Sequence, residues 1–100
     1  MATDQYHEPA QELTEETRDF ARLAQSLIEE AEAINWYQQR ISITKDNEVK
    51  KIMMHAQEEE FEHFAIDLEW VSRKLPTFRK KLQQILFKEG NIIENAEEQE

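Results

Sequence analysis

The chain has 100 residues, of which 39% are hydrophobic and 34% are charged, with one Gly, two Pro and no Cys. This length allows one small domain, and a composition poor in Gly and rich in Glu favours long helices. The lack of Cys excludes disulfides and thiolate metal sites, and the net charge of −10 argues against nucleic acid as a partner.

Residues 1–8 are polar and predict a flexible leader. The leader lacks the pattern of a signal peptide, and no apolar run in the sequence approaches the length of a membrane span. We therefore expect a cytoplasmic protein without a membrane partner.

The first predicted helix begins at Pro9 or Thr14 and runs to about Ile41. Acidic residues just after Thr14 favour a helix N-terminus at this point. Apolar side chains recur along one face at helical spacing, namely Phe20, Leu23, Leu27, Ile34, Tyr37 and Ile41. One acidic side chain, Glu30, falls in the middle of this apolar stripe.

Residues 42–47 predict the loop to a second helix, with Asp46 as its N-cap. This helix should run from about Asn47 to Lys74, because the residue before Pro76 disfavours helical geometry. Its apolar side carries Val49, Ile52, Met53, Ala56, Phe64, Trp70 and Val71. Glu60 lies among these side chains, and His63 follows one turn later on the same face.

A shorter amphipathic helix follows with Phe78, Leu82, Ile85 and Leu86, and we expect Gly90 to close it before an acidic tail over residues 91–100. The predicted fold class is therefore all-α, a single domain made of an antiparallel two-helix hairpin plus a short C-terminal helix. Two helices in so short a chain leave much of each stripe uncovered, so we expect dimerisation into a four-helix bundle.

Glu30, Glu60 and His63 together predict a metal centre. An unpaired carboxylate is costly to take out of water, so something must neutralise carboxylates within apolar stripes. Di-iron bundles use one Glu from each of two helices and a Glu-x-x-His from each of the other two, and one copy of this chain supplies half of that set. The spacing alone occurs by chance in many helices, and a Glu on a helix is usually solvated. The apolar side chains around these residues on both helices favour a metal site over solvated carboxylates. Carboxylate and imidazole ligands suit iron better than zinc.

Other polar side chains near this face have two interpretations each. Glu29, Glu32 and Trp36 form a flanking stripe that is either an oligomer contact or a funnel for cations. Asp67 either hydrogen-bonds a metal ligand or pairs with an Arg. A basic cluster is expected to pair with acidic surfaces of neighbouring subunits; it comprises Arg73, Lys74, Arg79, Lys80 and Lys81.

Several stretches, in order and spread over nearly the whole chain, resemble the encapsulated ferritins, the ferritin-like cargo proteins of encapsulin nanocompartments. They are His7-Glu8-Pro9, Glu29-Glu30-Ala31-Glu32-Ala33-Ile34-Asn35-Trp36-Tyr37-Gln38-Gln39-Arg40, Glu59-Glu60-Phe61-Glu62-His63, Leu68-Glu69-Trp70 and Leu86-Phe87-Lys88-Glu89-Gly90.

The resemblance implies a ferritin-like half-bundle whose di-iron site forms only across a homodimer, and a decameric ring of dimers with the third helix in the ring contacts. It maps the ferroxidase ligands onto Glu30, Glu60 and His63, with Tyr37 nearby. It assigns an outer metal-attracting site, open to calcium or another divalent cation, to Glu29, Glu32 and Trp36. The implied activity is oxidation of Fe(II) to Fe(III) with O2, and the implied partner is an encapsulin shell that stores the iron.

Family members often end in a short peptide that docks to the shell, whereas this sequence stops at Gln99-Glu100. Either the sequence is truncated, or docking uses a fusion or another route. Two alternatives to the ferroxidase stay open. One is a di-iron peroxidase of rubrerythrin type, although no Cys is present for the usual rubredoxin partner. The other is a non-catalytic helical oligomerisation module that metal only stabilises.

Overall fold

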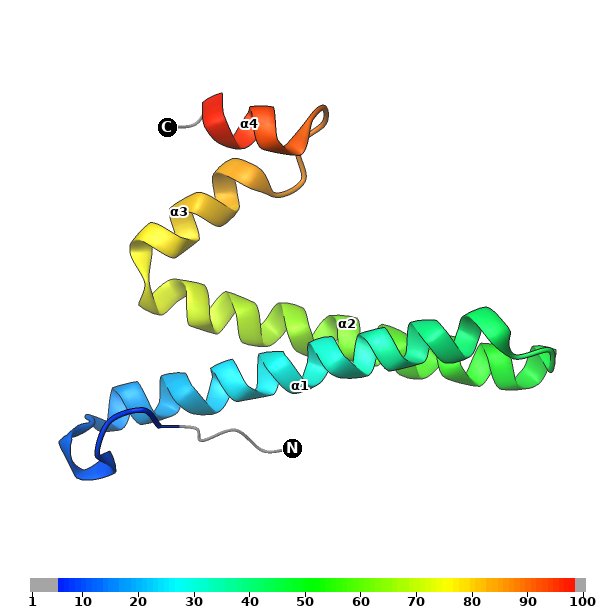
Figure 1. The fold of residues 1–100 in the computed structure, drawn as a ribbon, viewed down its shortest axis with the longest axis horizontal. Coiled ribbons are helices and arrows are strands. Elements are labelled where there is room, and N and C mark those ends of the chain that lie inside the picture. The colour runs from blue at the N-terminus through cyan, green and yellow to red at the C-terminus, as the bar shows by residue number, and fades with distance from the viewer. Residues whose placement is uncertain (1–5, 99–100) are drawn as a thin grey trace.

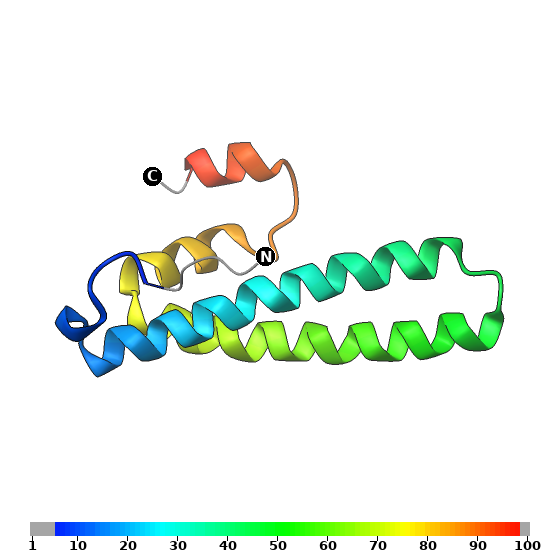
Figure 2. The ribbon, with the colours of Figure 1, turned by 60° about the horizontal axis from the view of Figure 1, so that its bottom comes forward.

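The structure is a computed structural model and describes residues 6–98. In this part of the chain, every regular element is helical: η1 (Ala10–Glu12), α1 (Glu15–Ile43), α2 (Asn47–Lys74), α3 (Pro76–Ile85) and α4 (Ile92–Glu98). α1 and α2 lie side by side as a long antiparallel hairpin, and α3 turns back from the end of α2 (Figures 1 and 2). The all-α class and the hairpin are therefore confirmed.

Thr14 sets the beginning of α1. Its hydroxyl oxygen accepts a hydrogen bond from the backbone N–H of Thr17 at 3.1 Å, as an N-cap does. Pro9, the other predicted start, precedes the short helix η1 instead. The Arg18 guanidinium donates to the Ala10 carbonyl and so holds η1 against α1. Residues 1–5 of the predicted leader lie outside the described residues, and residues 6–8 are not helical.

The hairpin loop is shorter than the sequence predicted. α1 continues to Ile43, and only residues 44–46 connect it to α2. Asp46 caps α2 as expected, because its carboxylate accepts from the backbone N–H groups of Glu48 at 2.9 Å and Val49 at 3.0 Å. α2 ends at Lys74, two residues before Pro76, as predicted.

The C-terminal region departs from the prediction at two points. α3 ends at Ile85 and not at Gly90, because Leu86 is extended and Phe87 has a positive φ of 61°. Gly90 lies in the following turn with φ 96°, a conformation that residues with a side chain rarely adopt. Residues 92–98 of the expected acidic tail then form α4, which begins where the Asn91 side chain accepts from the backbone N–H of Glu94.

The hairpin leaves most of its apolar surface uncovered. Among the described residues, Val71 is the one buried hydrophobic side chain, and the polar Gln57 and Ser72 are buried with it. The predicted stripe is mostly half-buried, but Ile52 is 60% exposed. The radius of gyration is 17.3 Å, against about 13 Å for a compact domain of this length. This open shape is consistent with one half of a dimeric four-helix bundle. No helix in residues 6–98 is long and apolar enough to cross a membrane.

Candidate metal centre

Three side chains that could bind a metal meet in the middle of the hairpin. Glu30 comes from α1, and Glu60 and His63 come from α2. Each offers one ligand atom, and these three atoms all lie within 4.8 Å of one another. Among residues 6–98, no other group of three His, Asp or Glu side chains has this property. The structure thus brings together the three residues that the sequence placed on facing stripes.

The two ligands on α2 are one helical turn apart. His63 Nδ1 lies 3.3 Å from Glu60 Oε1, so the rigid helix presents a nitrogen and an oxygen to the same point. The Glu60 side chain is 25% exposed, whereas that of His63 is 55% exposed. The expected burial is thus incomplete for His63, because a hairpin of two helices leaves this face open.

Glu30 has a buried carboxylate oxygen that a cation could bind. Its Oε1 is buried, and no group in the described part of the chain hydrogen-bonds to this oxygen. The pKa of Glu30 is raised to about 7, first by burial and then by hydrogen bonding with Asp67, while His63 opposes the rise. A buried carboxylate oxygen without a partner is unfavourable, and a divalent cation would satisfy it. Two carboxylates and an imidazole form a donor set that suits iron, so the residues fit this metal.

The environment of Asp67 supports one of its two predicted roles. Asp67 contributes to the pKa of Glu30 through a hydrogen bond and through repulsion between the two carboxylates. Within residues 6–98, the ion pairs do not include one between Asp67 and an Arg. Asp67 therefore belongs to the surroundings of the three-residue cluster.

A shallow cavity of about 220 Å³ opens beside the cluster. It is lined by Ser26, Glu29, Glu30 and Glu60, so Glu29 lies at the rim of the cluster. Ser26 was missed by the sequence analysis, although its position one turn before Glu30 on α1 could have indicated it. Glu32 and Trp36, the other members of the predicted outer site, are exposed and do not line this cavity.

Tyr37 is half-buried on α1, two turns beyond Glu30, and it does not belong to the three-residue cluster. Its ring lies 5.4 Å from the guanidinium carbon of Arg40, a cation–π contact.

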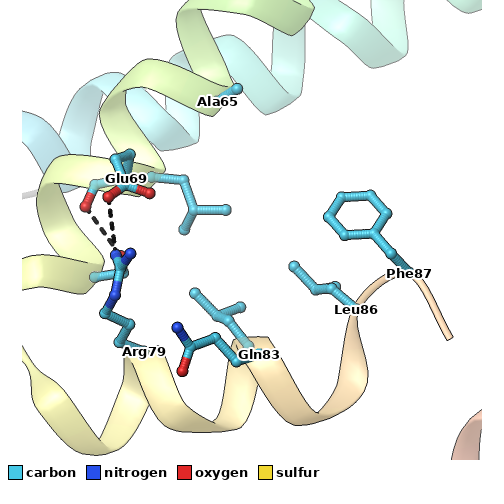
Figure 3. Close-up of a pocket in the computed structure, with 9 residues that line it drawn as sticks. Ala65, Glu69, Arg79, Gln83, Leu86 and Phe87 are labelled. Atoms are coloured by element: carbon cyan, nitrogen blue, oxygen red, sulfur yellow. Dashed lines mark hydrogen bonds and ion pairs between the residues drawn. The ribbon is translucent and has the colours of Figure 1, made fainter.

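Two members of the basic cluster pair within the chain, and the expected pairing of the cluster with neighbouring subunits stays a prediction. The Glu69 carboxylate accepts from Arg73 Nε at 2.6 Å and from Arg79 Nη1 at 2.9 Å, which lowers its pKa. This network closes one end of a cavity of about 380 Å³ between α2 and α3, with Leu86 and Phe87 at the other end (Figure 3). The surface of this cavity is mainly apolar, and none of the three candidate ligands lines it.

Comparison with known proteins gives consistent matches. Residues 5–89 match the model of the EncFtn-like family. A ferritin-like protein of Thermotoga maritima is 50% identical over 95% of this chain and 83% of its own length. An encapsulated ferritin-like protein of Rhodospirillum rubrum is 40% identical over 92% of this chain and 66% of its own length. The crystal structure of protein ne0167 from Nitrosomonas europaea has a TM-score of 0.83 and 48% identity, covering 89% of this chain and 98% of that one.

Proposed function

The chain belongs to the EncFtn-like family, and from this premise we propose that it is a ferroxidase that oxidises Fe(II) with O2 at a di-iron site formed across a homodimer. The observation that carries the proposal is the meeting of Glu30, Glu60 and His63, with ligand atoms within 4.8 Å of one another. The match to a curated ferritin-like protein over nearly the full chain points in the same direction.

The ligand count supports a site shared by two copies. One hairpin supplies one Glu from α1 and a Glu-x-x-His from α2, which is half of the ligand set of a carboxylate-bridged di-iron bundle. His63 remains more than half exposed, so the cluster faces the open side of the hairpin. A second hairpin related by a two-fold axis would cover this side and bring the other half of the set.

Each side chain would have its own task toward the iron substrate. Glu60 would bridge the two ions of the dimer, while Glu30 and His63 would complete their coordination. The pKa of Glu30 is about 7, so any proton that it carries must leave when a cation binds, because only the carboxylate is a good ligand. Each Fe(II) then gives up one electron, and O2 takes two electrons and two protons to form hydrogen peroxide. Fe(III) leaves as the product.

The path of iron to and from the cluster is also part of the proposal. Glu29, Glu32 and Trp36 would form an outer site that attracts Fe(II), calcium or another divalent cation, and the position of Glu29 beside the cluster supports it. Tyr37 would lie close to the reacting ions. The chain would form a decameric ring of dimers inside an encapsulin shell in the cytoplasm, and the shell would store the oxidised iron. The name of the encapsulated ferritin-like relative supports the encapsulation.

Stopped-flow absorbance and oxygen uptake on adding Fe(II) in air test this function. The parent protein should consume O2 rapidly, and Glu30→Ala, Glu60→Ala and His63→Ala should each abolish the rapid phase while helical circular dichroism persists. Glu62→Ala, an exposed neighbour of His63, is the matched control and should retain the activity. Unchanged oxygen uptake in all three cluster variants would refute the assignment. Metal-dependent assembly without oxygen uptake would instead support the non-catalytic oligomerisation module.

A further inference from the structure

Gln57 is a polar side chain buried between the two long helices. It is 7% exposed and belongs to the three buried residues of the described chain. Its amide nitrogen donates two hydrogen bonds across to α1, one to the backbone carbonyl of Ile34 at 3.2 Å and one to Gln38 Oε1 at 3.0 Å. A buried amide is tolerated only when its donors are satisfied, and α1 satisfies both.

These two bonds are directional links between α1 and α2. Over residues 6–98, the other hydrogen bond between these two helices is the one between Glu30 and Asp67 at the metal centre itself, and no ion pair joins them. The remaining contacts between them are apolar or van der Waals contacts, which resist sliding and rotation less specifically. The Ile34 carbonyl belongs to the helix backbone, so the bond to it fixes the position of α1 itself and not of a mobile side chain.

The link lies directly beside the candidate metal centre. Gln57 precedes Glu60 by three residues, about 4.5 Å along the helix axis, and Ile34 follows Glu30 by four residues, about 6 Å. Each helix therefore carries its link and its ligand within about one turn. A shift of α1 by one residue in register, with the accompanying rotation of about 100° around its axis, would turn Glu30 away from Glu60 and His63.

We propose that Gln57 is a positioning residue of the metal centre: by bonding to Ile34 and Gln38 it sets the register of α1 against α2 that brings Glu30 to Glu60 and His63. Gln57 does not touch the metal itself. The inference rests on the proposed function only where that function assigns a metal to these three side chains.

Cobalt(II) alone is a suitable probe, since its visible absorption reports the geometry of its ligands and its titration gives an affinity. Gln57→Leu keeps the volume and the burial but removes both donors. Gln38→Ala removes one of the two bonds and keeps the bond to Ile34. Gln39→Leu is the matched control, because the Gln39 side chain is exposed on α1 and its amide donates to Asn35 of the same helix.

We expect Gln57→Leu to weaken cobalt(II) binding about tenfold or more and to change the visible spectrum, with a smaller loss in Gln38→Ala and none in Gln39→Leu. The kcat of iron oxidation should fall most in Gln57→Leu, less in Gln38→Ala and not in Gln39→Leu.

A parental cobalt(II) affinity and spectrum in Gln57→Leu would overturn the inference, even if its melting temperature falls. Should Gln57→Leu fail to fold, Gln38→Ala decides: a weaker affinity supports the inference and a parental one overturns it. A parent that binds cobalt(II) at the cluster but never oxidises iron would overturn the proposed function alone, while a parent that binds none would overturn both.

Discussion

His63 Nδ1 lies 3.3 Å from Glu60 Oε1, because the two residues are about one turn apart on the same face of α2. The helix therefore holds these two candidate ligand atoms side by side before any cation arrives. Glu30 approaches the pair from α1 and adds a third atom within 4.8 Å. Two of the three positions thus depend on local helix geometry, and only the third depends on how the hairpin packs.

The N-cap of α2 should be a local source of stability. Asp46 accepts hydrogen bonds from two backbone N–H groups, so Asp46→Ala should lower the free energy of unfolding by about 1 kcal/mol. Urea denaturation followed by circular dichroism measures this loss. Asp46→Asn keeps the cap oxygen and should lose much less, and Lys45→Ala in the same loop should be neutral. An Asp46→Ala variant as stable as the parent would show that the cap does not contribute.

Local signals of this kind explain why the hairpin could be predicted. Thr14 and Asp46 indicate where the two helices begin, and Pro76 indicates where α2 ends. The spacing of the apolar residues places Glu30 and Glu60 on the faces by which the two helices meet. The C-terminal region lacked such signals. α3 ends before Phe87, which has a φ of 61°. This conformation is uncommon for a bulky residue, so the end of the helix could not be predicted from the residue type.

Two features of the site depended on packing. Gln57 lies four residues after Met53 and seven before Phe64, so its spacing already put it on the inner face of α2. Its amide partners on α1 could be named only once the helices were docked. His63 is exposed because a single hairpin is only half of a four-helix bundle. The sequence of one chain predicts a second hairpin but does not determine where it packs.

Metal should stabilise the folded protein by favouring association of two hairpins. Since Val71 is the single buried hydrophobic side chain in residues 6–98, a lone chain has little core. We expect the melting temperature to rise with protein concentration, and to rise further by several degrees on adding cobalt(II), because both favour an associated state. Differential scanning calorimetry measures both effects. His63→Ala should keep the concentration dependence and lose the response to metal; a full metal response in this variant would contradict the ligand assignment.

Stability of the metal-free protein should depend on pH through Glu30. The pKa of Glu30 is about 7 in the folded chain and near 4.5 in the unfolded chain, so between these values the folded state binds more protons. Stability should therefore fall as pH rises from about 5 to about 7 and level off above that. Thermal unfolding of the metal-free parent and of Glu30→Gln measures this slope, which the neutral amide should remove. An identical pH dependence in both proteins would exclude Glu30 as its source.

The affinity for metal should rise with pH, and Asp67 should control the pH at which binding begins. A cation must displace the proton of Glu30, so cobalt(II) affinity should fall as pH drops below about 7. Asp67 raises the pKa of Glu30, so Asp67→Asn should shift the onset of binding to lower pH. Cobalt(II) titrations at a series of pH values measure the shift. Asp19→Asn, remote on α1, is the control, and an unshifted onset in Asp67→Asn would mean that this carboxylate does not influence the cluster.

Glu29 should affect the capture of Fe(II) more than its oxidation. Glu29 lines the cavity that Glu30 and Glu60 also line, but it does not belong to the group of ligand atoms within 4.8 Å. Its charge can raise the local concentration of cations, an effect that salt screens. Glu29→Gln should therefore raise KM for Fe(II) several-fold and leave kcat nearly unchanged, and added salt should reduce the difference from the parent. Glu58→Gln, an exposed acid on α2, is the matched control and should leave both constants at the parental values. A loss confined to kcat in Glu29→Gln would instead place this carboxylate among the groups that act on bound iron.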